Sequence, residues 1–135
     1  WRTLNRRMHN KLLLIDDAVA ITGGRNYQDD YYDWDAAYNF RDRDLLVAGP
    51  VAREMAGNFA AFWSSPRSVP AERLSDVGGY LQRNGVPPLP HHPYRKPERV
   101  RALLERVVDA GHVRERLVEP ALDVDGVQFI ADGPA

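Results

Sequence analysis

The order of apolar and polar residues predicts a β-hairpin near the start of the chain. Residues 9–15 end in a continuous apolar run, which favours a strand buried on both faces. Asp16-Asp17 supplies a polar turn, and residues 18–22 are apolar enough to form the returning strand. Gly23-Gly24 then ends the hairpin, because two glycines allow a sharp turn and a close approach of the backbone to a ligand.

Further along, the pattern predicts another strand and then two helices. Residues 40–48 contain an apolar run that indicates a buried strand, stopped by Gly49-Pro50. Pro50 suits the first turn of a helix that runs to about residue 63. Its apolar residues fall on one side, where we expect them to face a core: Val51, Met55, Phe59, Phe62 and Trp63. Residues 97–110 repeat apolar positions at helical spacing, and Gly111 is placed to stop that helix.

These elements predict an α/β fold, a layered sheet with flanking helices. We expect a motif-bearing core at residues 1–63, a proline-rich region at 64–96, and a helix and terminal strand at 97–135, the strand falling at 127–131. The middle region holds six of the ten prolines, which favours an irregular excursion with little regular structure.

Composition narrows the class of protein. A chain of 135 residues with 44% hydrophobic and 27% charged residues fits one globular domain, and the first residue, Trp1, indicates a piece of a longer chain. The sequence has no apolar run of about eighteen residues, so we expect any membrane contact to be peripheral. The absence of cysteine excludes disulfides and cysteine nucleophiles. A net charge of −1 argues against nucleic acid as a partner, although basic residues gather near the hairpin: Arg2, Arg6, Arg7, Lys11 and Arg25.

The candidate chemistry lies on the hairpin, in the pattern His9-x-Lys11-x4-Asp16-x6-Gly23-Gly24-x-Asn26. In a strand, His9 and Lys11 point to the same side about 6 to 7 Å apart, so both can meet one phosphate. Gly23-Gly24 would bring Arg25 and Asn26 to the mouth of the same site, completing half of a phosphate pocket. Arg25 could contact a substrate phosphate or pair with Asp29 or Asp30, and the pattern does not separate these roles. Asp16 is expected to hold the turn or pair locally.

This pattern resembles the HxKxxxxD signature of the phospholipase D superfamily. The resemblance implies that His9 is a nucleophile forming a phosphohistidine, that Lys11 and Asn26 hold the phosphoryl oxygens, and that no metal or other cofactor is needed. A histidine nucleophile also needs an acceptor for its other ring nitrogen. Asp42 is the candidate acceptor, because residues 40–51 resemble the superfamily's aromatic-x-Asp stretch before a Gly-Pro pair, where an acidic residue backs the histidine. Asp44 lies on the same strand face and is the second choice.

Within that superfamily, three strings look most like the first catalytic half of bacterial cardiolipin synthases of the third type (cardiolipin synthase C and related phosphatidylserine, phosphatidylglycerophosphate and cardiolipin synthase-like proteins): residues 7–11, 23–26 and 42–51. Those enzymes transfer a phosphatidyl group between phospholipids. Residues 128–134 resemble the stretch that leads to the second half. Gly24 stands where many superfamily members have serine, which removes one hydroxyl donor.

The resemblance implies a phospholipid substrate, a peripheral position on the cytoplasmic side of a bacterial inner membrane, and a second HxK motif. That motif would come from the same full-length chain or from a homodimer partner, so this piece alone should be inactive. Two alternatives stay open: a homodimeric nuclease-type phosphodiesterase and a non-catalytic scaffold. The acidic, aromatic residues 27–35 would form a rim that touches a lipid headgroup, or a loop capped by its own aromatics. His91-His92 has no ligand partners at metal-binding spacing.

Overall fold

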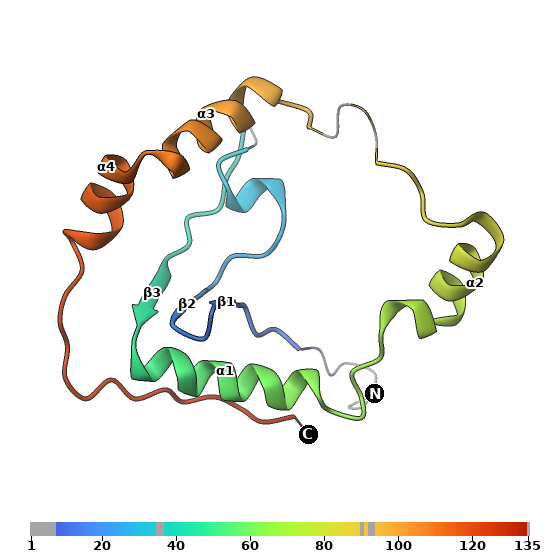
Figure 1. Ribbon diagram of the computed structural model, residues 1–135, viewed down its shortest axis with the longest axis horizontal. Helices are drawn as coiled ribbons and strands as arrows, with labels where there is room; N and C mark the ends of the chain where they lie inside the picture. Colours follow the sequence, from blue (N-terminus) through green and yellow to red (C-terminus); the bar gives the residue numbers. More distant parts are fainter. Residues whose placement is uncertain (1–7, 35–36, 90, 92–93, 135) are drawn as a thin grey trace. The chain divides into compact units, whose positions relative to one another are not determined.

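The computed structural model describes residues 8–34, 37–89, 91 and 94–134 of the 135-residue chain (Figure 1). The chain forms two compact units, which are described separately. Unit 1 comprises residues 1–68 and 127–135, and unit 2 comprises residues 69–126. The basic residues Arg2, Arg6 and Arg7, predicted to gather near the hairpin, lie outside the described residues.

Unit 1 contains the predicted hairpin as part of a three-stranded antiparallel sheet. The strands are β1 (Leu12–Ile15), β2 (Val19–Gly23) and β3 (Asp44–Ala48), in the order β1-β2-β3. The hairpin turn places Asp16 and Asp17 at φ values of 51° and 52°, and the Ala18 N–H donates to the Ile15 carbonyl over 3.0 Å. Aspartate tolerates this left-handed backbone better than most residues. The hairpin is therefore confirmed, but β1 begins at Leu12 rather than at residue 9.

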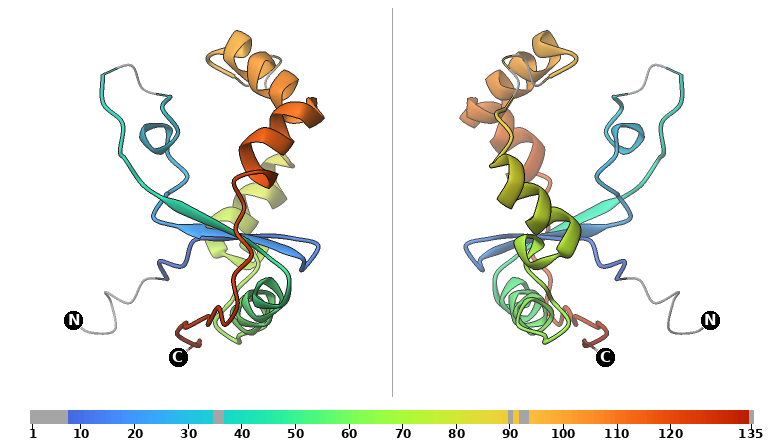
Figure 2. Two further views of the ribbon diagram at one scale, coloured as in Figure 1. Left: turned by 90° about the vertical axis from the view of Figure 1, so that its left-hand side faces the viewer. Right: turned by 90° about the vertical axis from the view of Figure 1, so that its right-hand side faces the viewer.

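One helix covers one face of this sheet. Helix α1 (Pro50–Trp63) begins with Pro50, as predicted, directly after Gly49 at φ 89°. Figure 2 shows α1 lying against the sheet on one side. The core between the two layers consists of Ala20, Ala52 and Met55, against which Leu12, Leu14, Val47 and Phe129 pack. This arrangement is a layered one, although all three strands precede α1 instead of alternating with helices.

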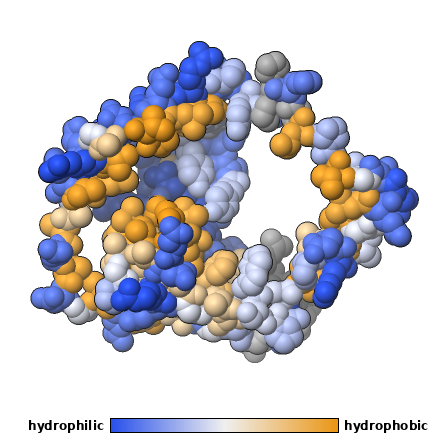
Figure 3. Space-filling view, in the orientation of Figure 1, coloured by the Kyte–Doolittle hydropathy of each residue, from blue (hydrophilic) through white to orange (hydrophobic). Residues whose placement is uncertain are grey.

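The face of the sheet that points away from α1 is apolar, and several of its side chains are about half exposed. Leu13, Ile21 and Leu46 are paired across the three strands. Leu13 is 48% exposed, Ile15 47% and Leu46 42%. Apolar side chains are visible over the strands in the space-filling view (Figure 3). The prediction of strands buried on both faces is therefore wrong for the described chain, because α1 packs on one side only.

Helix α1 extends beyond the sheet that it covers. Val51 and Met55 in its first half are buried, as predicted. Phe59 and Trp63 in its second half are 43% and 72% exposed, so the expectation that they face the core is wrong. A helix of 14 residues spans about 21 Å, whereas strands of four or five residues span about 13 to 17 Å. The last turns of α1 therefore have little sheet beneath them.

The last segment of unit 1 runs beside α1 without forming a strand (Figures 1 and 2). Phe129 packs against the core, and the side-chain amide of Asn58 donates to the Asp132 carbonyl over 3.0 Å. The predicted strand at residues 127–131 is wrong, since the sheet of the described chain has three strands and none includes this segment. Within this segment Phe129 packs against the core, whereas Ile130 is 83% exposed.

Unit 2 contains more helix than expected. A 3₁₀ turn (Ala71–Arg73) leads into α2 (Ser75–Asn84). The prediction of little regular structure across residues 64–96 is wrong. The prolines of this region lie at its two ends and leave residues 71–86 free of proline, which is long enough for a short helix.

The second predicted helix is confirmed as α3 (Pro97–Val108). It ends at Val108, two residues before the predicted end at residue 110. The Asp109 carboxylate accepts hydrogen bonds from the Gly111 and His112 N–H groups and so caps the next helix, α4 (Ala110–Val113). A π-helical stretch (Arg114–Val118) follows. Among the described residues, no helix is both long enough and apolar enough to span a membrane.

Candidate functional site

A polar cavity of about 270 Å³ lies beside the start of β1 in unit 1. We call it the polar cavity, and its lining residues are Met8, His9, Asn10, Lys11, Leu12, Arg25, Asn26 and Tyr27. The structure therefore brings together His9, Lys11, Arg25 and Asn26, which the sequence pattern had assigned to one phosphate site. It does not bring Asp16, Gly23, Gly24 or Asp42 to the wall of this cavity.

His9 and Lys11 lie on the segment that leads into β1. The Thr22 hydroxyl on β2 donates to the Lys11 carbonyl over 2.9 Å, which ties this segment to the sheet. The Lys11 ammonium donates to the His9 carbonyl over 2.9 Å. An ammonium has three N–H donors, so this contact leaves donors for a ligand. The His9 side chain is exposed and open to an incoming substrate.

Asn26 and Arg25 line the polar cavity from the loop after β2. The Asn26 side-chain amide donates to the Tyr31 hydroxyl over 3.0 Å, which uses one of its two N–H donors and orients the group. Arg25 forms an ion pair with Asp44, and its guanidinium also donates to the Tyr31 and Asp42 carbonyls.

The partner of Arg25 differs from the two acidic residues considered in the sequence. Arg25 pairs with Asp44, which precedes the apolar part of β3, and not with Asp29 or Asp30. Its guanidinium carbon also lies 5.8 Å from the centroid of the Tyr32 ring. Arg25 therefore fastens the loop after β2 to β3, and it lends the cavity a cation whose charge is partly balanced by Asp44.

The glycine pair makes room for β3. A Cβ atom added to Gly23 would lie 2.7 Å from the Arg43 carbonyl oxygen, and one added to Gly24 would lie 2.6 Å from a carboxylate oxygen of Asp42. Both distances are shorter than van der Waals contact. The sequence suggested that the glycines admit a ligand, but the space beside them is occupied by the β3 segment and its carboxylates.

Two other candidate residues are displaced from the polar cavity. Asp16 lies at the opposite end of β1 from His9, in the hairpin turn. Asp42 is half-buried beside Gly24, and in the part of the chain that the structure describes its carboxylate forms no hydrogen bond with His9. Among the described residues, Asp42 therefore does not serve as the acceptor for the second ring nitrogen of His9.

Aromatic residues close the loop after β2. Residues Asp29–Tyr31 form a 3₁₀ turn, and the Tyr31 ring stacks on Phe40 with centroids 4.6 Å apart. Tyr38 meets Phe40 edge-on at 5.2 Å. These contacts match a loop capped by its own aromatics. Tyr27 instead stands exposed on the rim of the polar cavity.

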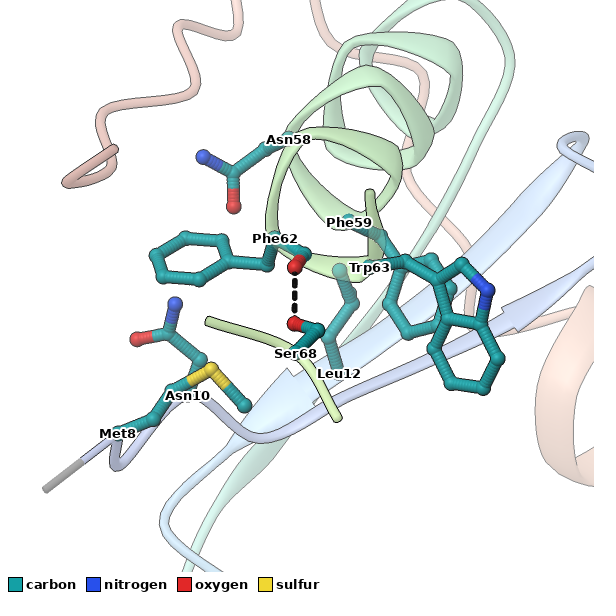
Figure 4. A pocket seen from close by; sticks show the side chains of 8 residues that line it. All are labelled: Met8, Asn10, Leu12, Asn58, Phe59, Phe62, Trp63 and Ser68. Atoms are coloured by element: carbon teal, nitrogen blue, oxygen red, sulfur yellow. Dashed lines mark hydrogen bonds between the residues drawn. The ribbon is translucent and has the colours of Figure 1, made fainter. Parts of the chain in front are cut away.

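Unit 1 has a second pocket that the sequence pattern did not indicate, which we call the apolar pocket. It measures about 130 Å³ and is lined by Met8, Asn10, Leu12, Asn58, Phe59, Phe62, Trp63 and Ser68 (Figure 4). The signal for this pocket in the sequence is the concentration of aromatic residues in the last turns of α1, whose apolar spacing equally fits residues that face a core.

No group of three or more histidine, aspartate or glutamate side chains among the described residues is placed to hold a metal ion. Of the His91-His92 pair, His92 lies outside the described residues. The polar cavity is lined by an imidazole, an ammonium, a guanidinium and an amide group. Such a set can attack a phosphoryl group and bind its oxygens.

Comparison with known proteins relates part of the chain to cardiolipin synthases. It is 39% identical to cardiolipin synthase C of Escherichia coli K12 over 74 residues, which are 55% of this chain and 16% of that protein. An uncharacterized protein of Helicobacter pylori 26695 is 40% identical over 74 residues, 55% of this chain and 15% of that protein. A cardiolipin synthase of Alkalihalophilus pseudofirmus is 37% identical over 62 residues, 45% of this chain and 12% of that protein.

The matched segments therefore make up about one sixth or less of the length of these relatives. No protein-family model matches the chain, and no solved structure matches it. The similarity supports a relationship to cardiolipin synthases over about half of the chain.

Proposed function

We propose that the polar cavity is one half of a phospholipase D-type active site that transfers phosphatidyl groups between phospholipids, with cardiolipin as the product. The observation that carries the proposal is the placement of His9, Lys11, Arg25 and Asn26 on one cavity wall. The similarity to cardiolipin synthases supports the substrate class.

In the proposed reaction, a ring nitrogen of His9 attacks the phosphorus atom of the donor phospholipid. A P–N bond forms while the P–O bond to the leaving alcohol breaks, and the leaving oxygen takes a proton from a general acid. Lys11 and Asn26 donate to the non-bridging oxygens as negative charge develops on them. The hydroxyl of an acceptor lipid then attacks the phosphohistidine, returns its proton to the acid and breaks the P–N bond.

The general acid is proposed to come from a second HxK motif, either in the same full-length protein or on a second copy. Residues 1–135 alone would then be inactive. We also propose that the full protein works at the cytoplasmic surface of the membrane. Asp42 is the proposed acceptor for the second ring nitrogen of His9, and it would meet the imidazole only after the segment before β1 moves toward β3.

The test uses the intact protein with phosphatidylglycerol vesicles and measures cardiolipin formation by mass spectrometry. His9→Asn should lower the rate by about a thousandfold or more, since a nucleophile is lost. His91→Asn is the matched control, because His91 is an exposed histidine of unit 2 outside the polar cavity, and it should leave the rate unchanged. Acid quenching during turnover should trap a phosphatidyl adduct on the peptide that contains His9.

Two results would overturn the proposal. Full transferase activity of His9→Asn would exclude His9 as the nucleophile and favour a non-catalytic scaffold. Cleavage of DNA or bis(p-nitrophenyl) phosphate that depends on His9, with no lipid transfer in vesicles, would favour the nuclease-type alternative.

A further inference from the structure

The apolar pocket adjoins the polar cavity and shares part of its wall. Met8, Asn10 and Leu12 line both spaces, while His9 and Lys11 line the polar cavity alone. The two spaces therefore lie on either side of one short segment before and at the start of β1. A ligand that crosses this segment would meet cationic donors on one side and apolar side chains on the other.

Aromatic rings from the last turns of α1 form much of the apolar pocket. Figure 4 shows Phe62 opposite Met8 and Asn10, with Phe59 and Trp63 grouped near Leu12. The Phe59 and Trp63 rings stack with centroids 5.8 Å apart and an angle of 19° between their planes. Both rings are exposed and do not belong to the buried core. Their exposed apolar area is available to a ligand.

Of the three polar residues that line the apolar pocket, two donate side-chain hydrogen bonds to backbone carbonyls of the protein. The Ser68 hydroxyl donates to the Phe62 carbonyl over 2.6 Å, as drawn in Figure 4. The Asn58 amide donates to the Asp132 carbonyl over 3.0 Å. Since these donors are engaged with the protein backbone, the pocket offers mostly hydrocarbon surface to an occupant. An alkyl chain suits such a lining better than a sugar or a nucleobase does.

We propose that the apolar pocket holds the first methylene groups of an acyl chain whose lipid phosphate lies in the polar cavity. This inference rests on the proposed function, because it assigns a second subsite to the same substrate. The two spaces share Met8, Asn10 and Leu12, and the lining changes from cationic to apolar across these residues. An amphiphile with a phosphate next to a hydrocarbon chain matches that change.

The first test measures binding to the intact protein without turnover. The probe is dodecyl phosphate below its micelle concentration, compared with glycerol phosphate, which has the phosphate but no alkyl chain. Dodecyl phosphate should bind at least about tenfold more tightly, and Phe62→Ala should remove most of that difference. Val86→Ala, at an exposed apolar residue of unit 2, is the matched control and should leave both affinities unchanged.

A second variant covers the case in which Phe62→Ala does not fold. Trp63 is 72% exposed, so Trp63→Phe should leave the fold intact. A dodecyl phosphate brominated along its chain should quench the fluorescence of the intact protein, and Trp63→Phe should remove that quenching. Quenching that persists unchanged in Trp63→Phe would place the chain elsewhere and overturn the proposal.

A kinetic comparison separates this inference from the proposed function. Phe62→Ala should raise KM for dihexanoyl phosphatidylglycerol about tenfold and leave cleavage of bis(p-nitrophenyl) phosphate unchanged. Equal losses on both substrates would indicate a structural role and overturn the inference while His9 chemistry stands. If transfer is absent but the alkyl-dependent binding and Trp63 quenching are present, the pocket stands and the transferase proposal fails. Protection of Trp63 from iodide in the ligand-free protein would show that another protein segment fills the pocket, which also overturns the inference.

Discussion

Replacing Gly23 with alanine should push β3 away from β2. Gly23 pairs with Asp44 across the sheet, and a Cβ atom at Gly23 would lie 2.7 Å from the Arg43 carbonyl oxygen and 2.9 Å from the Asp44 Cα. Ordinary contact begins near 3.4 Å, so the β3 backbone would have to retreat by about 0.5 to 0.7 Å. Overpacking of this kind costs about 1 to 3 kcal/mol of stability.

Gly24→Ala provides a direct comparison, because the three atoms nearest to its added Cβ all belong to the Asp42 side chain, the nearer carboxylate oxygen at 2.6 Å. A side chain can rotate away, at a cost of about 0.5 to 1.5 kcal/mol, whereas a paired backbone cannot. Asp42→Ala removes the contacting atoms and should therefore rescue Gly24→Ala. It should not rescue Gly23→Ala, because the Arg43 carbonyl and the Asp44 Cα remain.

The assay is hydrogen exchange of peptides that cover β2 and β3 in the intact protein, with mass-spectrometric detection. A local loss of 1 to 3 kcal/mol corresponds to exchange that is about 5 to 150 times faster. Exchange of Gly23→Ala at the wild-type rate would show that the added methyl group does not displace β3. Equal restoration of slow exchange by Asp42→Ala in both glycine variants would also contradict the prediction, since the two contacts would then be of the same kind.

Two further predictions concern the core and the loop after β2. Met55→Ala should lower the free energy of unfolding by about 2 to 5 kcal/mol, because Met55 is 5% exposed within a small core. The control is Val107→Ala on α3, which is 63% exposed and should cost under about 0.5 kcal/mol. Similar shifts of the thermal unfolding midpoint in both variants would refute this prediction. Arg25→Lys should loosen residues 27–34, because lysine cannot reproduce the Asp44 ion pair together with both carbonyl contacts. Limited proteolysis should therefore cleave this loop several-fold faster in the variant. An unchanged cleavage rate would show that these contacts do not hold the loop.

The hairpin and both long helices were predictable because their signals are local. The Asp16-Asp17 turn, Pro50 and Pro97 each act on the backbone within a residue or two. The helix within residues 64–96 was not predicted, because the high number of prolines in this region argued against a helix. Their positions allow one, since residues 71–86 contain no proline. The end of α3 was misplaced because Asp109 and Gly111 are both common near helix ends, and only the geometry shows that Asp109 caps the following helix.

The site was predictable in part for a related reason. His9, Lys11 and Asn26 lie close to one another in sequence or across the hairpin and line one cavity, although β1 begins at Leu12, so His9 and Lys11 precede the strand in which they were expected. The Arg25–Asp44 pair depends on the register between β2 and β3, which are separated by a long loop whose path no short pattern sets. The apolar pocket depends on the length of α1 compared with the length of the strands beneath it. The spacing of apolar residues along α1 gives no information about that difference in length.

The carboxylates at the ends of β1 and β3 have a consequence for solubility. Both strands are sheet edges with apolar sequences, LLLI and DLLVA, and such edges can pair with another chain while a protein is being synthesised. Asp16 and Asp17 directly follow β1, while Asp42 lies just before β3 and Asp44 is its first residue. We expect Asp16 and Asp17 to act as gatekeepers, since stacking the β1 strands of neighbouring chains would bring their like charges together, whereas the charge of Asp44 is balanced by Arg25. The turn residues that shape the hairpin would thus also limit pairing of this sheet edge with another chain.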